Sequence, residues 1–143
     1  MTQRLATVED IPALVEMGQK FHTMSPHASM GAYDPEAVAR VIAFMIESPQ
    51  SVVLTNGTGA IGATYAPIFF GPSQWLCEEN FFFSEGRGGF DLLDGLIEHA
   101  RGWGASHVSM STLENAKAHV IDRLMTRKGF RFIERRYIKE LPK

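Results

Sequence analysis

The sequence has one cysteine, Cys77, among its 143 residues. A single thiol excludes an intramolecular disulfide framework and any zinc site built from several cysteines. Cys77 lies in an apolar stretch, where a free cysteine usually behaves as a small buried hydrophobic residue. Burial opposes the thiolate form, and no histidine is adjacent in the sequence, so an acyl-carrying nucleophile at Cys77 is disfavoured.

The chain also lacks an excess of positive charge. Fourteen basic and sixteen acidic side chains give a formal net charge of −2. A protein that binds a polyanion usually shows a basic excess, so we expect no nucleic-acid partner. The C-terminal third is locally basic, but Asp122 and Glu134 are interspersed, and a solvated face is favoured there over a site for an anionic ligand. Its basic residues are Arg123, Arg127, Lys128, Arg131, Arg135 and Arg136.

Long hydrophobic runs are absent as well. No apolar run approaches the roughly 18 residues that span a bilayer, and residues 1–9 are too polar for the core of a signal peptide. We therefore expect no membrane partner and a cytoplasmic location. A hydrophobic fraction of 45% with 21% charged residues is ordinary for a globular protein, and the length favours one domain over residues 1–143.

The hydrophobic patterns predict an order β-α-α-β-β-β-α-β-α-β, which is an α+β class with a mixed sheet and helices on both faces. Asp34-Pro35 is an N-cap followed by proline at the first helical position, and Asn56-Gly57 is a strong hairpin signal. The expected strands are 3–7, 51–55, 58–70 (ending near Pro67), 75–83, 107–112 and a last strand region at 130–140. The expected helices begin at Ile11, Asp34, Leu92 and Asn115, the second with a buried stripe that includes Val41, and residues 22–33 are expected to form a loop.

A glycine-rich loop, Ser84–Gly89, joins an apolar strand to a helix. Such a turn exposes backbone N–H groups at a helix N-terminus, where the partial positive charge favours a phosphate, and Arg87 adds a cation there. The loop lacks the Gly-Lys-Ser/Thr ending of an ATP-binding P-loop. It also comes after mid-chain, whereas a dinucleotide fold has its glycine fingerprint early in a parallel βαβ unit. Both of these nucleotide-binding alternatives are therefore poor.

Three segments in this order resemble the GNAT superfamily of acyl-CoA-dependent N-acyltransferases. Residues 4–14 are similar to the usual first strand and helix start of that family. The glycine loop, with Leu92-Leu93 and residues 98–105 behind it, looks like the acyl-CoA motif. Residues 123–130, Arg-Leu-Met-Thr-Arg-Lys-Gly-Phe, look like the closing helix and Gly-Phe turn. The resemblance covers nearly the whole chain.

The resemblance implies an α/β/α sandwich whose mixed, mostly antiparallel sheet has its fourth strand splayed from the fifth. Acetyl-CoA, the expected co-substrate, would lie in the gap. The resemblance places its pantetheine arm against the backbone of Phe81, Phe82 and Phe83, and its pyrophosphate on amides of Arg87, Gly88, Gly89 and Phe90. Asn115 would either hydrogen-bond a pantetheine amide or cap the last helix.

The chain departs from the family pattern at two places. The family loop runs Gln/Arg-x-x-Gly-x-Gly/Ala, whereas alignment on Leu92-Leu93 puts Ser84 first, Arg87 in the middle and Gly89 last. A shift by one residue recovers Gly88 in the middle but puts Phe90 last. Many members also place a tyrosine four residues before the closing Gly-Phe, as general acid for the CoA thiolate. Met125 occupies that position, and a thioether has no proton to donate.

The acid–base candidates lie near the expected gap. Glu79 and Glu78 precede the CoA loop, and strand alternation sends them to opposite faces, so at most one of them reaches the cleft; we predict Glu79 as the base. A solvent-facing carboxylate is an equally good interpretation. His22, His27 and Tyr33 lie on the connection that should border the acceptor site, and exposed loop histidines are the simpler interpretation of the first two. No third ligand is spaced to suggest a metal site.

The sequence therefore predicts an N-acetyltransferase that acts on a primary amine of a small molecule or a protein. The alternative is a degenerate member that binds acyl-CoA without turnover, as a sensor or interaction module, and Met125 and the altered loop favour it. A plain interaction domain without cofactor is a third reading. A homodimer is compatible with the sequence, and no residue identifies the acceptor.

Overall fold

The structure, a computed structural model, describes residues 2–85, 88–113 and 118–143. Within them, five strands form one sheet in the order β1-β2-β3-β4-β5. The strands are β1 (Arg4–Leu5), β2 (Ser51–Thr55), β3 (Gly59–Ile68), β4 (Gly71–Ser84) and β5 (His107–Ser109). The pairs from β1 to β4 are antiparallel, and β5 lies parallel to β4. The expected mixed, mostly antiparallel sheet is thus confirmed.

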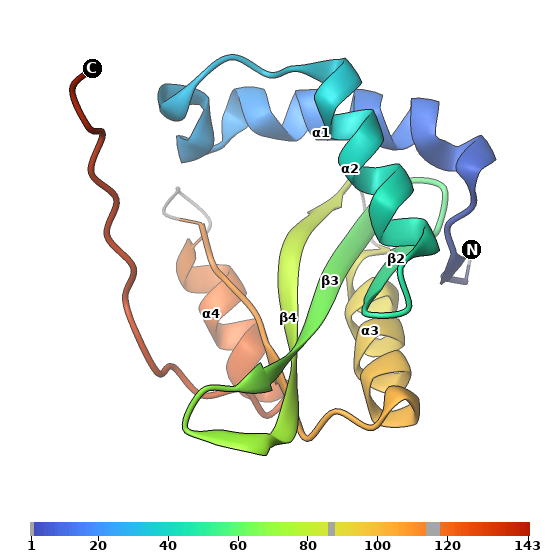
Figure 1. Cartoon of the computed structure of the whole chain (residues 1–143), viewed down its shortest axis with the longest axis vertical. Helices are drawn as coiled ribbons and strands as arrows, with labels where there is room; N and C mark the ends of the chain where they lie inside the picture. The colour runs from blue at the N-terminus through green and yellow to red at the C-terminus, as the bar shows by residue number, and fades with distance from the viewer. Residues whose placement is uncertain (1, 86–87, 114–117) are drawn as a thin grey trace.

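Helices cover both faces of this sheet (Figure 1). They are α1 (Ile11–Met24), α2 (Pro35–Glu47), α3 (Gly89–Trp103) and α4 (Ala118–Arg127), with short 3-10 turns η1 (Val8–Asp10) and η2 (Pro26–Met30). One core joins α1 and α2 to the sheet and contains Leu14, Ile42 and Met45. The other joins α3 to the opposite face and contains Leu92, Leu96 and the buried Cys77. The structure is therefore the predicted α+β sandwich.

Local signals in the sequence account for several element boundaries. The Asp34 side chain accepts a hydrogen bond from the Ala37 N–H at 3.1 Å and so caps α2. Gly57, in the β2–β3 hairpin, and Gly104, after α3, have φ values of 88° and 102°, which side chains with a Cβ rarely adopt. These short-range signals act through the backbone itself, and the boundaries that they predict are confirmed.

The connection between the first two helices differs from the prediction. Residues 22–24 form the last turn of α1 instead of a loop, and η2 follows almost at once. Ser25 joins the two: its N–H donates to the His22 carbonyl, and its hydroxyl accepts from the His27 N–H. The backbone groups of this segment are thus satisfied locally, although the apolar periodicity has ended. In α2, Val41 is exposed and not part of the buried stripe.

The C-terminal strands predicted at residues 130–140 are not formed. The chain after α4 is extended but pairs with no strand among the described residues, and it runs along one side of the molecule (Figure 1). β5 is also shorter than predicted, with three residues. Strand propensity alone does not produce a strand, because a strand needs a hydrogen-bonded partner. The order observed for the described residues lacks the last strand for this reason.

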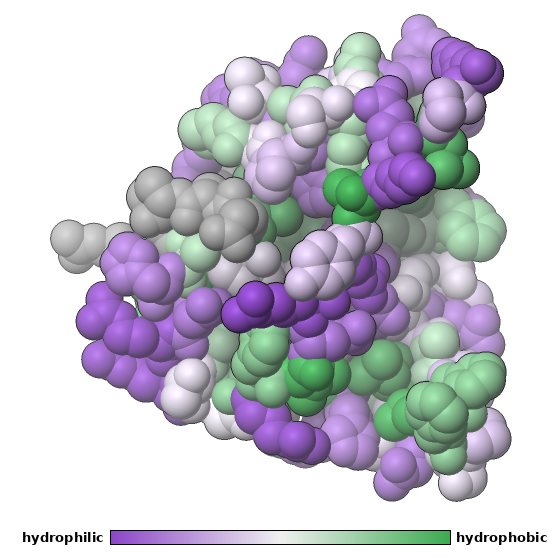
Figure 2. Space-filling view, turned by 90° about the vertical axis from the view of Figure 1, so that its left-hand side faces the viewer, coloured by the Kyte–Doolittle hydropathy of each residue, from purple (hydrophilic) through white to green (hydrophobic). Residues whose placement is uncertain are grey.

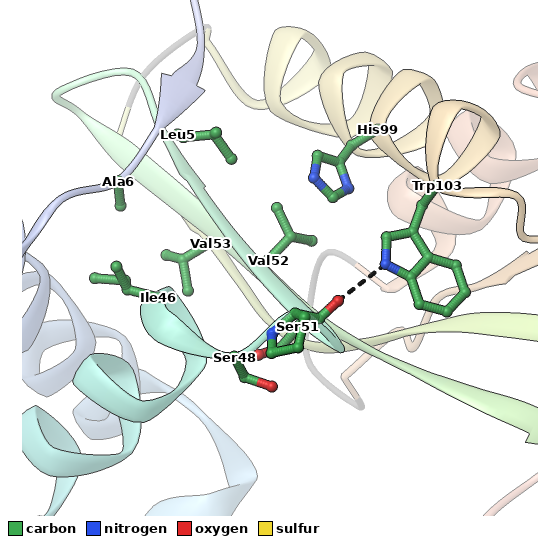
Figure 3. A pocket seen from close by; sticks show the side chains of 10 residues that line it. Leu5, Ala6, Ile46, Ser48, Ser51, Val52, Val53, His99 and Trp103 are labelled. Atoms are coloured by element: carbon green, nitrogen blue, oxygen red, sulfur yellow. Dashed lines mark hydrogen bonds between the residues drawn. The ribbon is translucent and has the colours of Figure 1, made fainter.

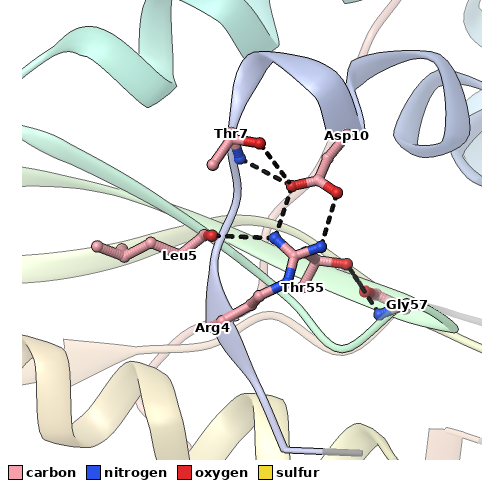
Figure 4. A network of polar contacts seen from close by, with 7 residues as sticks. Arg4, Leu5, Thr7, Asp10, Thr55 and Gly57 are labelled. Carbon is pink, nitrogen blue, oxygen red and sulfur yellow. Dashed lines mark hydrogen bonds and ion pairs between the residues drawn. The ribbon is translucent and has the colours of Figure 1, made fainter.

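An ion pair fastens the N-terminal strand to the start of the first helical segment (Figure 4). The Arg4 guanidinium donates two hydrogen bonds to the Asp10 carboxylate, at 2.7 and 2.8 Å. The Thr7 N–H donates to the same carboxylate at 2.8 Å, as in a capping box. The hydrogen bond from Arg4 is the main cause that holds the pKa of Asp10 well below its ordinary value.

We expect Asp10→Asn to lower the melting temperature at pH 7 by a few degrees. A carboxyl group whose pKa is lowered by folding stabilises the native state above its unfolded pKa of about 4, and that contribution is lost as the pH falls below it. The difference between the two proteins should therefore shrink in acid. Thermal melts from pH 7 to pH 2 measure it. Glu9→Gln, in the same turn but exposed, is the control, and an equal effect of both changes would contradict the assignment.

Candidate functional site

An irregularity in β4 lies at the centre of the candidate site. Gly62 of β3 pairs with Phe81, but the next residue, Ala63, pairs with Glu79. Asn80 is therefore an extra residue without a partner, which makes a β-bulge. The bulge changes which face each side chain occupies: Cys77 packs on the α3 side, whereas Phe81, four residues later, packs on the α1–α2 side. Regular alternation would place both on one face.

β4 and β5 separate directly before the bulge, where their pairing ends at Glu78. Leu76, Cys77 and Glu78 pair with His107, Val108 and Ser109, and no pair follows them among the described residues. The Glu79 side chain crosses the opening, since its Oε1 accepts a hydrogen bond from the Ser111 N–H at 3.0 Å. The sheet thus opens into a gap directly beside Glu79, which agrees with the splayed strand pair expected from the sequence.

The environment of Glu79 changes its acidity. Burial raises the pKa of the Glu79 carboxyl from 4.5 to about 7, although the Ser111 N–H opposes this shift; the nearby Glu78 adds a smaller increase. A carboxyl group with this pKa exchanges a proton near neutral pH. Perturbed acidity beside a gap in a sheet is typical of a group that takes part in catalysis. Glu78 pairs with Thr64, so its side chain points to the other face, as predicted.

The segment Phe81–Phe83 forms one wall of the gap. Phe81 and Phe83 stack with ring centroids 5.4 Å apart, and Phe21 of α1 lies 5.7 Å from Phe83. Phe82 packs against the α3 core instead. A Cβ at Gly62 would lie 2.2 Å from the Phe81 ring, so glycine is required opposite the bulge. The aromatic rings fix this strand, while its edge toward β5 has no strand partner in the part of the chain that the structure describes.

The glycine loop is tied to the β2–β3 hairpin. The buried Asn56 donates from Nδ2 to the Gly88 carbonyl at 3.0 Å, and its Oδ1 accepts from the Thr58 N–H at 3.0 Å. A Cβ at Gly88 would lie 2.3 Å from the Asn56 amide nitrogen. Sequence reasoning used Asn56 only as a turn signal and missed this role. The hairpin therefore sets the position at which α3 begins.

The first turn of α3 presents free donors. Leu92 donates to the Gly88 carbonyl, but the amides of Gly89, Phe90 and Asp91 precede the first intrahelical bond and donate to no acceptor among the described residues. Gly89 and Phe90 are two of the loop residues whose amides were expected to meet a pyrophosphate, and Asp91 was not among them. Two other predicted cofactor residues, Arg87 and Asn115, lie outside the described residues.

Solved structures share this fold over the length of the chain. One is a transcriptional regulator from Bacillus halodurans C-125, with a TM-score of 0.76, 17% identity, and 98% of this chain and 99% of that chain covered. Another is glucosamine-6-phosphate N-acetyltransferase from Arabidopsis thaliana, with a TM-score of 0.72 and 12% identity; the match covers 99% of this chain and 98% of that chain. A third is a predicted acetyltransferase with acetyl-CoA from Clostridium acetobutylicum, with a TM-score of 0.70 and 13% identity; the match covers 97% of this chain and 95% of that chain.

Most of the similar structures are named acetyltransferases. This chain has the GNAT fold. The resemblance seen in the sequence is confirmed at the level of fold, and identities this low do not extend to the substrate. No protein-family model and no curated protein sequence matches the chain.

In this GNAT fold the predicted acceptor residues lie in the last turn of α1, for His22, and on the connection to α2, for His27 and Tyr33. The His22 and Tyr33 rings are 5.5 Å apart. The Tyr33 hydroxyl donates to the Val15 carbonyl of α1 at 2.8 Å, and burial raises the pKa of Tyr33. His27 is exposed, with Nδ1 3.3 Å from the Met30 sulfur. Tyr33 is thus used to anchor the connection to α1, and His22 packs beside it.

A groove lies between α2 and the sheet of the GNAT fold. Its volume is about 560 Å³. Its wall on α2 includes the exposed Phe44, and its floor includes the bulge residue Asn80 and Phe81. It is lined by Val41, Phe44, Met45, Ser48, Gln50, Ser51, Thr64, Tyr65, Asn80 and Phe81. These side chains carry no charge at neutral pH, and sequence reasoning did not identify the groove because its lining comes from four separate elements.

A smaller cavity of about 240 Å³ lies beside the groove, with which it shares Ser48 and Ser51, between the end of α2 and α3 (Figure 3). Trp103 closes it by donating from Nε1 to the Pro49 carbonyl at 3.0 Å. His99 lines it, with Nδ1 2.6 Å from the Tyr65 hydroxyl, and burial lowers the pKa of His99. Tyr65 in turn stacks on Trp103 at 4.1 Å. This aromatic cluster joins α3 to the sheet and is remote in sequence from the glycine loop.

Met125 lies half-buried in α4, where its carbonyl accepts from the Phe130 N–H at 2.9 Å. Within residues 2–85, 88–113 and 118–143, no group of three or more His, Cys, Asp or Glu side chains is arranged to hold a metal ion. The same part of the chain contains no helix that is long and apolar enough to cross a membrane.

Proposed function

We propose that this protein is an N-acetyltransferase that moves an acetyl group from acetyl-CoA to a primary amine by direct attack. The observation that carries the proposal is Glu79, a carboxylate with a pKa of about 7 in the gap between β4 and β5. The fold supports it, since most of the similar structures are named acetyltransferases and one of them was solved with acetyl-CoA. A cytoplasmic location remains part of the proposal.

The proposed reaction needs one base. The amine nitrogen attacks the thioester carbonyl carbon, the new C–N bond forms, and the C–S bond breaks to release the CoA thiolate. Glu79 accepts the proton that the nitrogen loses, directly or through one water molecule. Met125 has no proton to give the thiolate, so solvent supplies it. The remaining contribution of the protein is to hold the two reactants in position.

The proposed co-substrate site uses backbone groups on two sides of the gap. The amides of Gly89, Phe90 and Asp91, which have no acceptor among the described residues, suit the negative charge of a pyrophosphate at the N-terminus of α3. The unpaired edge of Phe81–Phe83 suits an arm that adds like a strand. Arg87 and Asn115 belong to the proposal on the sequence resemblance alone.

We further propose that the groove beside Asn80 receives the acceptor. It lies on the α1–α2 face of the sheet beside Asn80, whereas Glu79 lies on the α3 face, so the amine would reach Glu79 through the gap between β4 and β5; the lining of the groove is uncharged. Such a lining favours an amine on an apolar or aromatic body over a polycationic or phosphorylated one, because a charge would lose water without gaining a partner. His22, His27 and Tyr33 remain candidates for the rim of this site.

The test of the function is release of the CoA thiol from acetyl-CoA over a panel of amines, with apolar, aromatic, polycationic and phosphorylated members and lysine-containing peptides. Turnover is expected with the apolar or aromatic amines. Binding of acetyl-CoA, seen as thermal stabilisation over adenosine controls, without turnover of any amine would favour the alternative, a GNAT domain that binds acyl-CoA as a sensor or interaction module. The methionine at position 125 is the observation that favours that alternative.

We expect Phe44→Ala to raise KM for the best amine by about tenfold and to leave kcat nearly unchanged. Phe44 is 72% exposed, so its removal spares the core, while covering one aromatic side chain with a ligand contributes about 1.5–3 kcal/mol. Loss of such binding without loss of rate is the mark of a contact made equally in the ground and transition states. Phe69→Ala, at a residue that is 86% exposed on the β3–β4 connection, is the control, and an unchanged KM in Phe44→Ala would reject the groove.

A further inference from the structure

The cavity between the end of α2 and α3 is built like a site for a small molecule (Figure 3). Its volume is about 240 Å³. An apolar cavity of about 150 Å³ holds one benzene molecule, so this cavity has room for an aromatic ring with a substituent. Most of its lining is apolar, namely Leu5, Ala6, Ile46, Val52, Val53 and Trp103.

The cavity exists because the first strand of the sheet is short. β1 has two residues, and the last backbone hydrogen bond from this segment to β2 runs from the Ala6 N–H to the Val53 carbonyl at 2.9 Å. The chain then turns into η1, so the beginning of β2, at Ser51, has no strand beside it on that side within the described residues. Leu5 lines the cavity and is 58% exposed, so the space is open at the edge of the sheet.

The surface on the side of α4 is different (Figure 2). Hydrophobic residues there lie in separate clusters among hydrophilic ones. In the cavity, apolar side chains from β1, α2, β2 and α3 surround a single space, together with the imidazole of His99. Apolar side chains that converge around a placed polar group are typical of a small-molecule site.

His99 supplies the cavity with a hydrogen-bond donor. Its Nδ1 lies 2.6 Å from the Tyr65 hydroxyl, and neither side chain makes another hydrogen bond within the described residues. Burial raises the pKa of Tyr65, so the hydroxyl keeps its proton and donates to Nδ1; the reverse direction would leave that proton without an acceptor. Burial also lowers the pKa of His99, so the imidazole is neutral near pH 7 and carries its one ring proton on Nε2.

This N–H group is accessible from the cavity. Within the described residues, no fully buried side-chain nitrogen or oxygen lacks a partner, so Nε2 of His99, which lacks one, is not fully buried. In Figure 3 the His99 ring projects from α3 into the space beside Leu5 and Val52. Nε2 therefore has a proton to donate to a molecule in the cavity.

The other polar groups of the lining are already engaged. The Ser51 hydroxyl donates to the Met45 carbonyl at 2.8 Å, and the Ser48 hydroxyl accepts from the Gln50 N–H at 3.2 Å. No Asp, Glu, Lys or Arg among the described residues lines the cavity. An ionic ligand would lose its water without gaining a counter-charge, whereas a neutral ligand with an acceptor atom would be matched.

We propose that this cavity is a second ligand site, which binds a neutral aromatic molecule that carries an acceptor oxygen. The ring lies against the apolar lining, and the oxygen accepts from Nε2–H of His99. The ligand contacts four elements at once, so its binding stabilises the fold. The inference does not depend on the proposed reaction, and the cavity shares only Ser48 and Ser51 with the acceptor groove.

Acetophenone is the probe, and α-methylstyrene, in which a CH2 group replaces the ketone oxygen, is its matched control. In an NMR titration of the full chain, acetophenone should shift the indole N–H signal of Trp103, with a dissociation constant below about 1 mM. α-Methylstyrene should bind about fivefold more weakly, since it cannot accept from His99. Benzoate should bind more weakly than either. No binding of acetophenone in the millimolar range, or equal affinities of acetophenone and α-methylstyrene, would overturn the proposal.

Two substitutions at position 99 separate the donor from the packing. His99→Asn can accept from the Tyr65 hydroxyl through its Oδ1 but has no donor at the position of Nε2. His99→Gln is longer and can place its amide N–H near that position. The preference for acetophenone over α-methylstyrene should fall from about fivefold to about onefold in His99→Asn and be retained in His99→Gln. Equal preferences in the two variants, with normal melting curves, would exclude His99 as the donor.

Leu5→Ala and Phe44→Ala locate the probe. Leu5 lines the cavity and not the groove, Phe44 lines the groove and not the cavity, and both side chains are exposed, so neither change disturbs the core. Leu5→Ala should weaken the binding of both molecules by about fivefold, because it removes apolar contact area. Phe44→Ala should leave both affinities unchanged. An unchanged affinity in Leu5→Ala, or a loss in Phe44→Ala, would overturn the second site and leave the proposed reaction untouched.

Discussion

Glu79→Gln is expected to lower kcat/KM by about 10²–10⁴-fold, the usual contribution of a positioned general base. Glutamine has the shape of glutamate and its oxygen can still accept from the Ser111 N–H, so the geometry of the gap is conserved. What it loses is the ability to take a proton from the attacking amine. Binding of acetyl-CoA should change little, since Glu79 is assigned to the amine and not to the co-substrate.

The pH profile is the more specific readout. A base works only when ionised, so the wild-type kcat/KM should rise as the pH passes through about 7, the pKa to which burial raises Glu79. In Glu79→Gln that acidic limb should flatten. Glu78→Gln, at the neighbouring position on the opposite face, is the matched control. It should retain both the value of kcat/KM and the acidic limb of its pH profile. Equal damage by the two changes, or damage by Glu78→Gln alone, would remove Glu79 from the role of base.

The same group gives a readout that is independent of activity. A carboxyl whose pKa is raised by folding is more readily protonated in the native than in the unfolded state, so the wild-type protein loses stability as the pH rises from about 4.5 to about 7. In Glu79→Gln the side chain at position 79 does not ionise, so the stability of the variant does not fall through this cause between pH 4.5 and pH 7. Melting temperatures of the two proteins should therefore diverge across this window, with the variant more stable at pH 8. Parallel curves would show that Glu79 is not buried as the structure has it.

Gly89→Glu is expected to weaken acetyl-CoA binding by about 10²-fold or more. Position 89 opens α3, and its amide is one of the three free donors proposed to meet the pyrophosphate. A carboxylate there would face the pyrophosphate across a short distance, and juxtaposed like charges cost several kcal/mol. The substitution should not harm the fold: an added Cβ would lie 3.5 Å from Phe82 and Ser84, an ordinary contact distance.

Titration calorimetry with acetyl-CoA measures this effect. Gly89→Ala adds the Cβ without the charge and is expected to bind nearly as well as the wild type. Gly88→Ala is a different case, because its Cβ would collide with the Asn56 side chain at 2.3 Å and disturb the loop itself. If Gly89→Glu binds acetyl-CoA with unchanged affinity while its melting curve is normal, the pyrophosphate is held elsewhere. A loss with Gly89→Ala as large as with Gly89→Glu would mean that bulk and not charge is responsible.

The sequence by itself determined the features that depend on near neighbours. The cap at Asp34, the Asn56-Gly57 hairpin and the end of α3 at Gly104 are decided by the backbone preferences of a few adjacent residues, so a short pattern predicts them. The order of strands and helices through α4 follows from hydrophobic periodicity. Together with the glycine loop, these patterns were sufficient to predict the GNAT fold and the gap in which to look for a site.

Only the tertiary structure decided the details of the site, because they depend on residues that are distant in the sequence. The bulge at Asn80 exists through the register between β3 and β4, and Glu79 is partly buried by elements that meet only after folding. Glycine is required at position 88 because the Asn56 side chain, 32 residues away in the sequence, lies against it. The proposed acceptor groove is formed by residues of four separate elements. The segment after α4 shows the same limit: residues 130–140 have the composition of a strand, but composition alone does not supply the hydrogen-bonded partner that a strand needs.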